Sequence, residues 1–195
     1  IKTVGDNRVG CVHFNNTGDP ITGKNFLVFE GSGTLTAADA DFYVFTEYGN
    51  TGYYSNHYDA AIGNSDSQDN CYGIIINSGT IFAGTTLAEN CSAIGGGGNG
   101  VGEVTINGGV VTAMATTTGN AIGGGIGFSS YGGVGLVNIH GGNVYAYNHK
   151  NKYSSVPNGI PSSAIGGAGT NASYVKPGTT VNITGGSVYA QSGFG

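Results

Sequence analysis

Basic residues are scarce in this chain, which carries only six Lys and Arg against eleven Asp and Glu. The formal net charge of −5 argues against nucleic acid as a partner, because binding to phosphates needs a basic face. Long apolar runs are also missing, and no stretch approaches the ~20 apolar residues that span a bilayer, so we expect no membrane insertion. Apolar residues at helical spacing are absent, and glycine fills 39 of the 195 positions, which excludes a helical fold.

Cysteine is limited to three positions, Cys11, Cys71 and Cys91, which permit at most one internal disulfide. A disulfide is typical of an extracellular protein, and buried free thiols are the alternative. No pair of Cys or His has the spacing of a zinc site. Tryptophan is absent and Asn, Thr, Gly and Tyr are abundant, a composition typical of a secreted surface protein.

What the chain does contain is a repeated phrase. The isoleucine of a short Ala-Ile-Gly sequence recurs at positions 62, 94, 122 and 165, which gives a period of about 30 residues with one long insertion. A second phrase follows each copy: IIINSGTIFA at 74–83, VTINGGVVTA at 104–113, VNIHGGNVYA at 137–146 and VNITGGSVYA at 181–190. A degenerate copy at 27–37 has one residue inserted between its two glycines. Periods of this length indicate stacked supersecondary units.

Apolar and polar residues alternate inside each copy, which is the period of a half-buried strand. Val104 and Ile106 fall on the core side, whereas Thr105 falls on the other. The glycine pair between two strands supplies a sharp corner. The pattern therefore predicts an all-β chain, a right-handed single-stranded parallel β-helix of about five rungs. The alternative, a flexible linker, does not keep Ile and Val in register with strand parity.

The repeats predict a single structural domain over residues 27–195, preceded by an irregular N-terminal cap over residues 1–26, which show no repeat phrase. The chain starts without a signal-peptide pattern and stops where the next Ala-Ile-Gly phrase is due. We therefore expect a fragment of a longer protein, or an end-to-end or homo-oligomeric contact at the C-terminal rung.

Two groups of aromatic residues are the candidate ligand-binding residues. One is an outward column on the strand after the glycine pair, formed by Phe82, Tyr145 and Tyr189. Exposed rings beside hydrogen-bonding groups suit the pyranose rings of a glycan, although Tyr and Phe also stabilise strands without a ligand. The other group is expected to form the wall of a trough and belongs to the 38–60 insertion: Tyr43, Tyr48, Tyr53, Tyr54 and Tyr58.

Carboxylates are confined to the first 103 residues. Glycoside hydrolysis needs two of them flanking the scissile bond, and only the 38–60 insertion is dense enough to supply a pair. Hard oxygen ligands also gather at Asp59, Asp66 and Asp69, where the alternatives are a Ca²⁺ site and a solvated polar loop. We expect no other cofactor.

At these phrases, over about 27–190, the chain resembles the glycine-rich AIGGG and TINGG repeats of secreted and cell-surface proteins of Gram-positive bacteria. Such arrays look like right-handed parallel β-helices akin to carbohydrate-binding and polysaccharide-lyase-like solenoids. The resemblance implies an extracellular location, secreted or on the cell surface, and it transfers no catalytic motif onto any position here.

We therefore expect non-catalytic carbohydrate binding or adhesion, with a glycan or a host or cell-surface polysaccharide as the partner. One alternative is a polysaccharide-active enzyme, a glycoside hydrolase or lyase, that uses carboxylates of the 38–60 insertion. The other alternative is a purely structural stalk array.

Overall fold

A computed structural model describes residues 1–13, 26–38, 60–63, 72–85, 91–96, 103–115, 119–124, 135–149, 163–167 and 179–193. Every regular element in these residues is a β-strand, and every strand pair is parallel. The predicted all-β, parallel architecture is therefore confirmed. The described part of the chain holds no helix with the length and apolar character needed to cross a membrane.

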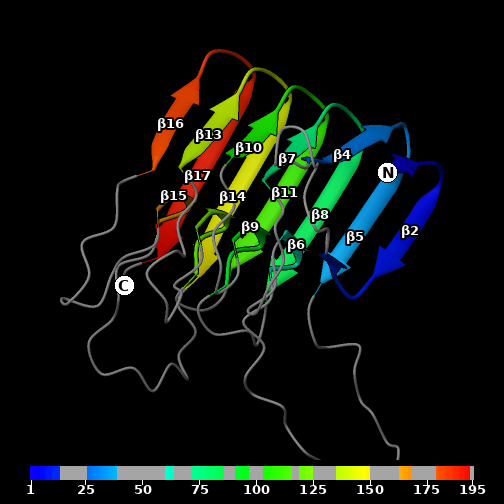
Figure 1. Cartoon of the computed structure of the whole chain (residues 1–195), viewed down its shortest axis with the longest axis horizontal. Coiled ribbons are helices and arrows are strands. Elements are labelled where there is room, and N and C mark those ends of the chain that lie inside the picture. The colour runs from blue at the N-terminus through cyan, green and yellow to red at the C-terminus, as the bar shows by residue number, and fades with distance from the viewer. Residues whose placement is uncertain are drawn as a thin grey trace, which may run out of the picture.

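The strands form three parallel sheets, which Figure 1 shows running side by side along the molecule. The first sheet contains β1 (Lys2–Thr3), β4 (Phe26–Gly31), β7 (Gly73–Ile76), β10 (Glu103–Ile106), β13 (Leu136–Ile139) and β16 (Thr180–Ile183). The second contains β2 (Asp6–Val9), β5 (Thr34–Ala38), β8 (Thr80–Thr85), β11 (Val110–Ala115), β14 (Asn143–His149) and β17 (Ser187–Gly193). The third contains β3 (Val12–His13), β6 (Ile62–Gly63), β9 (Ile94–Gly95), β12 (Ile122–Gly123) and β15 (Ile165–Gly166).

Strands three places apart along the chain pair with each other, so successive copies of the repeat add one strand to each sheet, except that the last two strands, β16 and β17, are followed by no strand of the third sheet in the described residues. This is the connectivity of a β-helix-like solenoid, in which a repeat contacts only its neighbours. The one-residue insertion of the first copy is confined to the corner between β4 and β5, because both strands keep their register with β7 and β8.

The N-terminal segment corrects one prediction. Residues 1–26 were expected to form an irregular cap, but β1, β2 and β3 extend all three sheets by pairing with β4, β5 and β6. Asn7 of β2 stands at a position where later copies carry aliphatic core residues. Its Nδ2 group donates hydrogen bonds to the carbonyl oxygens of Val4, Gly5 and Thr34, at 3.3, 3.3 and 3.1 Å. A polar side chain thereby closes this end of the core.

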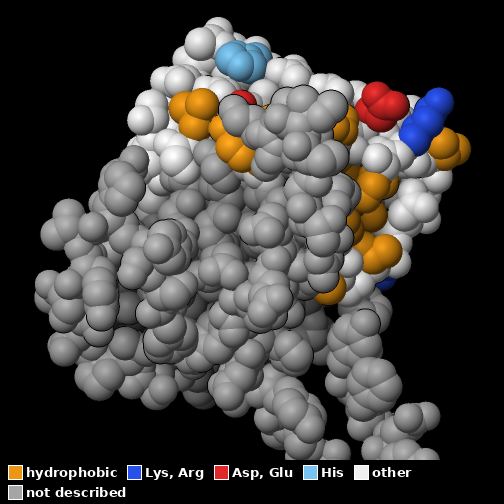
Figure 2. All heavy atoms as spheres, in the orientation of Figure 1, with side chains coloured by type: hydrophobic (Ala, Val, Ile, Leu, Met, Phe, Trp, Pro, Cys, Tyr) orange, Lys and Arg blue, Asp and Glu red, His pale blue; other side chains and the backbone are white. Residues whose placement is uncertain are grey.

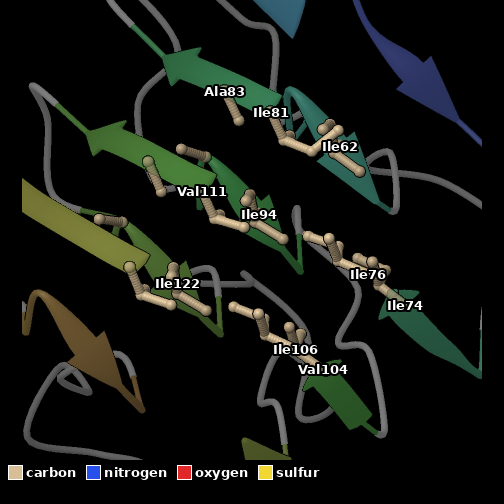
Figure 3. Packing of buried hydrophobic residues seen from close by; sticks show 14 of the residues in the cluster. Ile62, Ile74, Ile76, Ile81, Ala83, Ile94, Val104, Ile106, Val111 and Ile122 are labelled. Carbon is tan, nitrogen blue, oxygen red and sulfur yellow. The ribbon is translucent and has the colours of Figure 1, made fainter. Parts of the chain in front are cut away.

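The core consists of aliphatic columns in register, as the alternation predicts. In the third sheet the paired column is Ile62, Ile94, Ile122 and Ile165. In the first sheet it is Ile76, Ile106, Ile139 and Ile183. Figure 3 shows side chains of the second and third sheets meeting in the interior, with Ile81 beside Ile62 and Val111 beside Ile94. Ile183 belongs to the last strand of its sheet and is 54% exposed, whereas its column neighbours are buried.

Glycine is required where the corners of successive copies stack on each other. Gly95 has a φ of +133°, and a Cβ at this position would collide with the carbonyl oxygen of Gly123 in the next copy. Gly142, at the corner between β13 and β14, has a φ of +85°, and a Cβ there would lie 2.6 Å from the carbonyl oxygen of Gly109. Side chains at these corners are excluded both by the backbone conformation and by the neighbouring copy.

Replacing Ile106 by Ala should lower the free energy of unfolding by about 2–5 kcal/mol, because the cavity lies between two fully occupied neighbours in the column. Val110→Ala is the matched control, since Val110 faces outward and is only half-buried. Urea unfolding followed by circular dichroism measures both variants. Equal losses of stability would contradict the assignment of inward and outward faces.

Replacing Gly95 by Ala should cost more than the ~1 kcal/mol of a tolerated glycine substitution, because the new methyl group meets a backbone carbonyl that cannot move aside alone. Gly84→Ala is the control: Gly84 lies on an outward face, and its nearest neighbour to a Cβ is 4.0 Å away. Thermal unfolding should therefore separate the two variants. Similar midpoints would show that the corner has room.

Candidate ligand-binding face

The outer face of the second sheet carries the aromatic column that the sequence predicts. Phe82 of β8, Thr112 of β11, Tyr145 of β14 and Tyr189 of β17 pair in succession. Because neighbouring residues of a strand point to opposite faces, the buried side chain of Ile81 places that of Phe82 outside. Phe82, Tyr145 and Tyr189 are 47%, 38% and 52% exposed. The column therefore lies where a ligand can reach it.

A second outward column of side chains runs beside the first, and the repeat phrases did not predict it. It includes Met114, Tyr147 and Gln191, which pair in register. The Tyr147 ring stacks on the His149 ring, with centroids 5.8 Å apart and planes at 8°. It also packs against the Tyr189 ring at 5.7 Å and 49°. The Tyr189 hydroxyl donates a 3.3 Å hydrogen bond to Gln191 Oε1.

Tyr147 and His149 follow the repeat phrase that ends at residue 146, so the phrase alone does not place them on a strand. β14 continues to His149, one residue beyond Asn148, which pairs with the last residue of β11. The available signal was the unbroken alternation of outward positions 143, 145, 147 and 149, which extends the period of the strand.

The outward positions of β8, β11, β14 and β17 hold no Lys, Arg, Asp or Glu. Charged side chains of the second sheet occur on β2, as Asp6 and Arg8. In the view of Figure 2, the coloured Lys, Arg, Asp and Glu side chains lie mainly at the end of the molecule where Figure 1 shows the N-terminal strands. Asn143 and Ser187 add neutral hydrogen-bonding groups beside the rings. The face thus combines aromatic surface with uncharged polar groups.

The first sheet carries a polar ladder on its outer side. Glu103 Oε1 accepts hydrogen bonds from Thr105 Oγ1 at 2.7 Å and from Asn138 Nδ2 at 3.2 Å. Asn182 Nδ2 donates to Asn138 Oδ1 at 3.0 Å. Thr105 is only 8% exposed, so this outward residue is not the freely solvated one that strand parity alone suggests. The ladder satisfies its members within the sheet and acts as scaffold.

Two buried asparagines also belong to the scaffold. Asn120 Nδ2 donates to the carbonyl oxygens of Gly124 and Gly166 at 2.6 and 3.0 Å, and Asn120 Oδ1 accepts from the backbone N–H of Ser163 at 2.7 Å. Asn148 similarly donates its Nδ2 to a backbone carbonyl oxygen of an earlier copy. These side-chain amides connect successive copies at places where backbone N–H and C=O groups are not paired between strands.

Asn120→Ala should lower the free energy of unfolding by about 1–3 kcal/mol for each buried backbone group that loses its partner. Ser92 occupies the same place one copy earlier, and its buried hydroxyl has no hydrogen-bond partner among the described residues. Ser92→Ala should therefore be neutral or stabilising. Chemical denaturation of both variants checks the contrast, and a larger loss for Ser92→Ala would refute it.

Several predicted residues lie outside the described part of the chain. The predicted wall consists of Tyr43, Tyr48, Tyr53, Tyr54 and Tyr58. The calcium candidates are Asp59, Asp66 and Asp69. These assignments, the carboxylates of the 38–60 insertion and any disulfide of Cys71 stay predictions. Within the described ranges, no cluster of three or more His, Cys, Asp or Glu side chains is arranged to hold a metal ion.

The C-terminal strands of the first and second sheets expose apolar side chains. Val181 and Ile183 on β16 are exposed, although the residues paired with them on β13 are fully buried. The contact expected at this end, whether end-to-end or homo-oligomeric, stays a prediction.

Comparison with protein-family models, with curated proteins and with solved structures finds no match to this chain. The resemblance to glycine-rich surface repeats stays an interpretation of the repeated phrases. What the fold and the face define is a class: a β-helix-like repeat protein with an uncharged, exposed aromatic face on one of its three sheets. Its function has to be inferred from the chemistry of that face.

Proposed function

We propose that this chain is a non-catalytic carbohydrate-binding or adhesion domain of a secreted or cell-surface protein, built as a right-handed single-stranded parallel β-helix of about five rungs. One observation carries the proposal: Phe82, Tyr145 and Tyr189 are exposed and in register on a face without charged side chains from β8 onward. Aromatic rings beside neutral hydrogen-bonding groups recognise the C–H faces and hydroxyls of sugars.

The energetics predict weak binding at a single face. Stacking a sugar on a Tyr or Phe ring removes apolar area from water at roughly 25 cal/mol per Å². One ring then contributes only a few kcal/mol before ordering costs, which corresponds to dissociation constants in the micromolar to millimolar range. Repetition of the domain on a cell surface would add avidity without new contacts.

The charge distribution favours a neutral glycan over a polyanion. The net charge is −5. Within the described residues, the outward column that holds the aromatic side chains contains one cation, Arg8, which lies on β2 at the far end of the sheet. A uronic-acid polymer would approach without compensating positive charge, so its carboxylates gain nothing from this face.

A polysaccharide-active enzyme remains the alternative, and its carboxylates would have to come from the 38–60 insertion. β14 and β17 offer none, because the sequence contains no Asp or Glu after Glu103, and β8 carries none either. Hydrolysis of a glycosidic bond needs two carboxyl groups at that bond. The face of β14 and β17 has none, so it can bind a glycan but cannot cleave it. A structural stalk, the other alternative, would need no exposed rings.

Titration with neutral and uronic-acid oligosaccharides, followed through tyrosine NMR shifts, tests the proposal. Tyr145→Ala should weaken binding of a neutral oligosaccharide roughly tenfold, the effect of losing about 1.4 kcal/mol of stacking. Thr34→Ala, on the same sheet but away from the rings, should bind like the unmodified protein. No binding at all would favour the structural alternative, and preference for the uronic-acid ligand would contradict the assignment of a neutral glycan to this face.

A further inference from the structure

Side-chain size alternates along the outward column of the second sheet from β2 to β14. In strand order from β2 to β17 the column reads Arg8, Thr36, Phe82, Thr112, Tyr145 and Tyr189. Thr112 is thus a small, half-buried residue with one exposed aromatic side chain on each side. A continuous flat platform would instead need large rings on consecutive strands.

The neighbouring rings leave Tyr145 available. Tyr189 packs against Tyr147 and donates its hydroxyl hydrogen bond to Gln191, so its ring is held by residues of the second column. In the described part of the chain, no ring contact involves Tyr145 or Phe82. These two rings are therefore free to contact a ligand from opposite sides of Thr112.

The spacing suits the insertion of one ring. Strands lie about 4.8 Å apart, so the backbones of β8 and β14 are roughly 10 Å apart on either side of β11. A ring held between two aromatic faces needs about 3.5 Å on each side, or about 7 Å in all. β11 runs between the strands that carry Phe82 and Tyr145, with Val110 and Met114 on the same outward side as Thr112.

We propose that a neutral glycan lies along β11, with one pyranose ring inserted edge-on between Phe82 and Tyr145 above Thr112. This inference rests on the proposed carbohydrate-binding function and specifies the site and its sugar. A pyranose whose substituents are all equatorial presents C–H bonds on both faces, and so matches two aromatic walls. An axial hydroxyl would point into one wall and lose its hydrogen bonds to water. The site thus prefers gluco-configured chains.

Filling the gap is the decisive test, because it keeps both walls. Thr112→Tyr should weaken cellohexaose binding at least tenfold, and the fold should tolerate it since Tyr145 and Tyr189 occupy this position on the next two strands. Thr36→Tyr is the matched control, with the same substitution in the same column, and should bind like the unmodified protein. Calorimetry measures affinities, and the unmodified protein should prefer cellohexaose to mannohexaose.

The outcomes separate this site from the broader function. Unchanged or tighter cellohexaose binding by Thr112→Tyr would overturn the gap and favour a continuous platform. An equal loss in Thr36→Tyr, or a preference for mannohexaose, would also overturn it. Failure of the unmodified protein to bind either hexasaccharide would overturn this site, whereas the proposed function itself is overturned only if the neutral oligosaccharides of the NMR titration do not bind either. Should Thr112→Tyr fail to fold, Thr112→Gln fills the same gap with a smaller side chain and should show the same loss.

Discussion

The structure depends on backbone contact between copies in the third sheet, whose strands are two residues long. The glycine of each Ala-Ile-Gly phrase lies on the glycine of the next, all with positive φ: Gly63, Gly95, Gly123 and Gly166 at 144°, 133°, 140° and 141°. A Cβ on any of the first three would collide with the carbonyl oxygen of its successor. Only glycine permits this approach, and the approach fixes the register in which the isoleucine columns then pack.

In-register stacking also determines where functional chemistry can sit. Inward positions are filled by aliphatic columns, and the buried amides of Asn120 and Asn148 are consumed by backbone carbonyls. In the described residues, outward positions on the second sheet neither fill the core nor hydrogen-bond to the backbone of another copy. A substitution there, such as Phe in one copy and Thr in the next, changes the surface without disturbing the stack.

The sequence was sufficient for the strand parity, the parallel stacking of the repeats and the aliphatic core, because each follows from a periodic property that appears in every copy. It failed where periodicity is short or local. β1 to β3 are two to four residues long and lack the glycine phrase, so their membership of the sheets follows only from pairing. The Tyr147 and His149 stack depends on how far β14 extends, and Thr105 is buried beside Asn138 of the neighbouring strand, which donates to its Oγ1 at 3.5 Å.

Pairing that always runs to the third strand along the chain means that stability passes from one copy to the next, without long-range shortcuts. Unfolding of such a stack begins at its ends and moves inward. A molecule seated above Thr112 would touch β8, β11 and β14, and so would tie three successive copies into one cooperative block. Ligand occupancy would then be visible as a slower, more concerted loss of the middle of the stack, even where the ends fray unchanged.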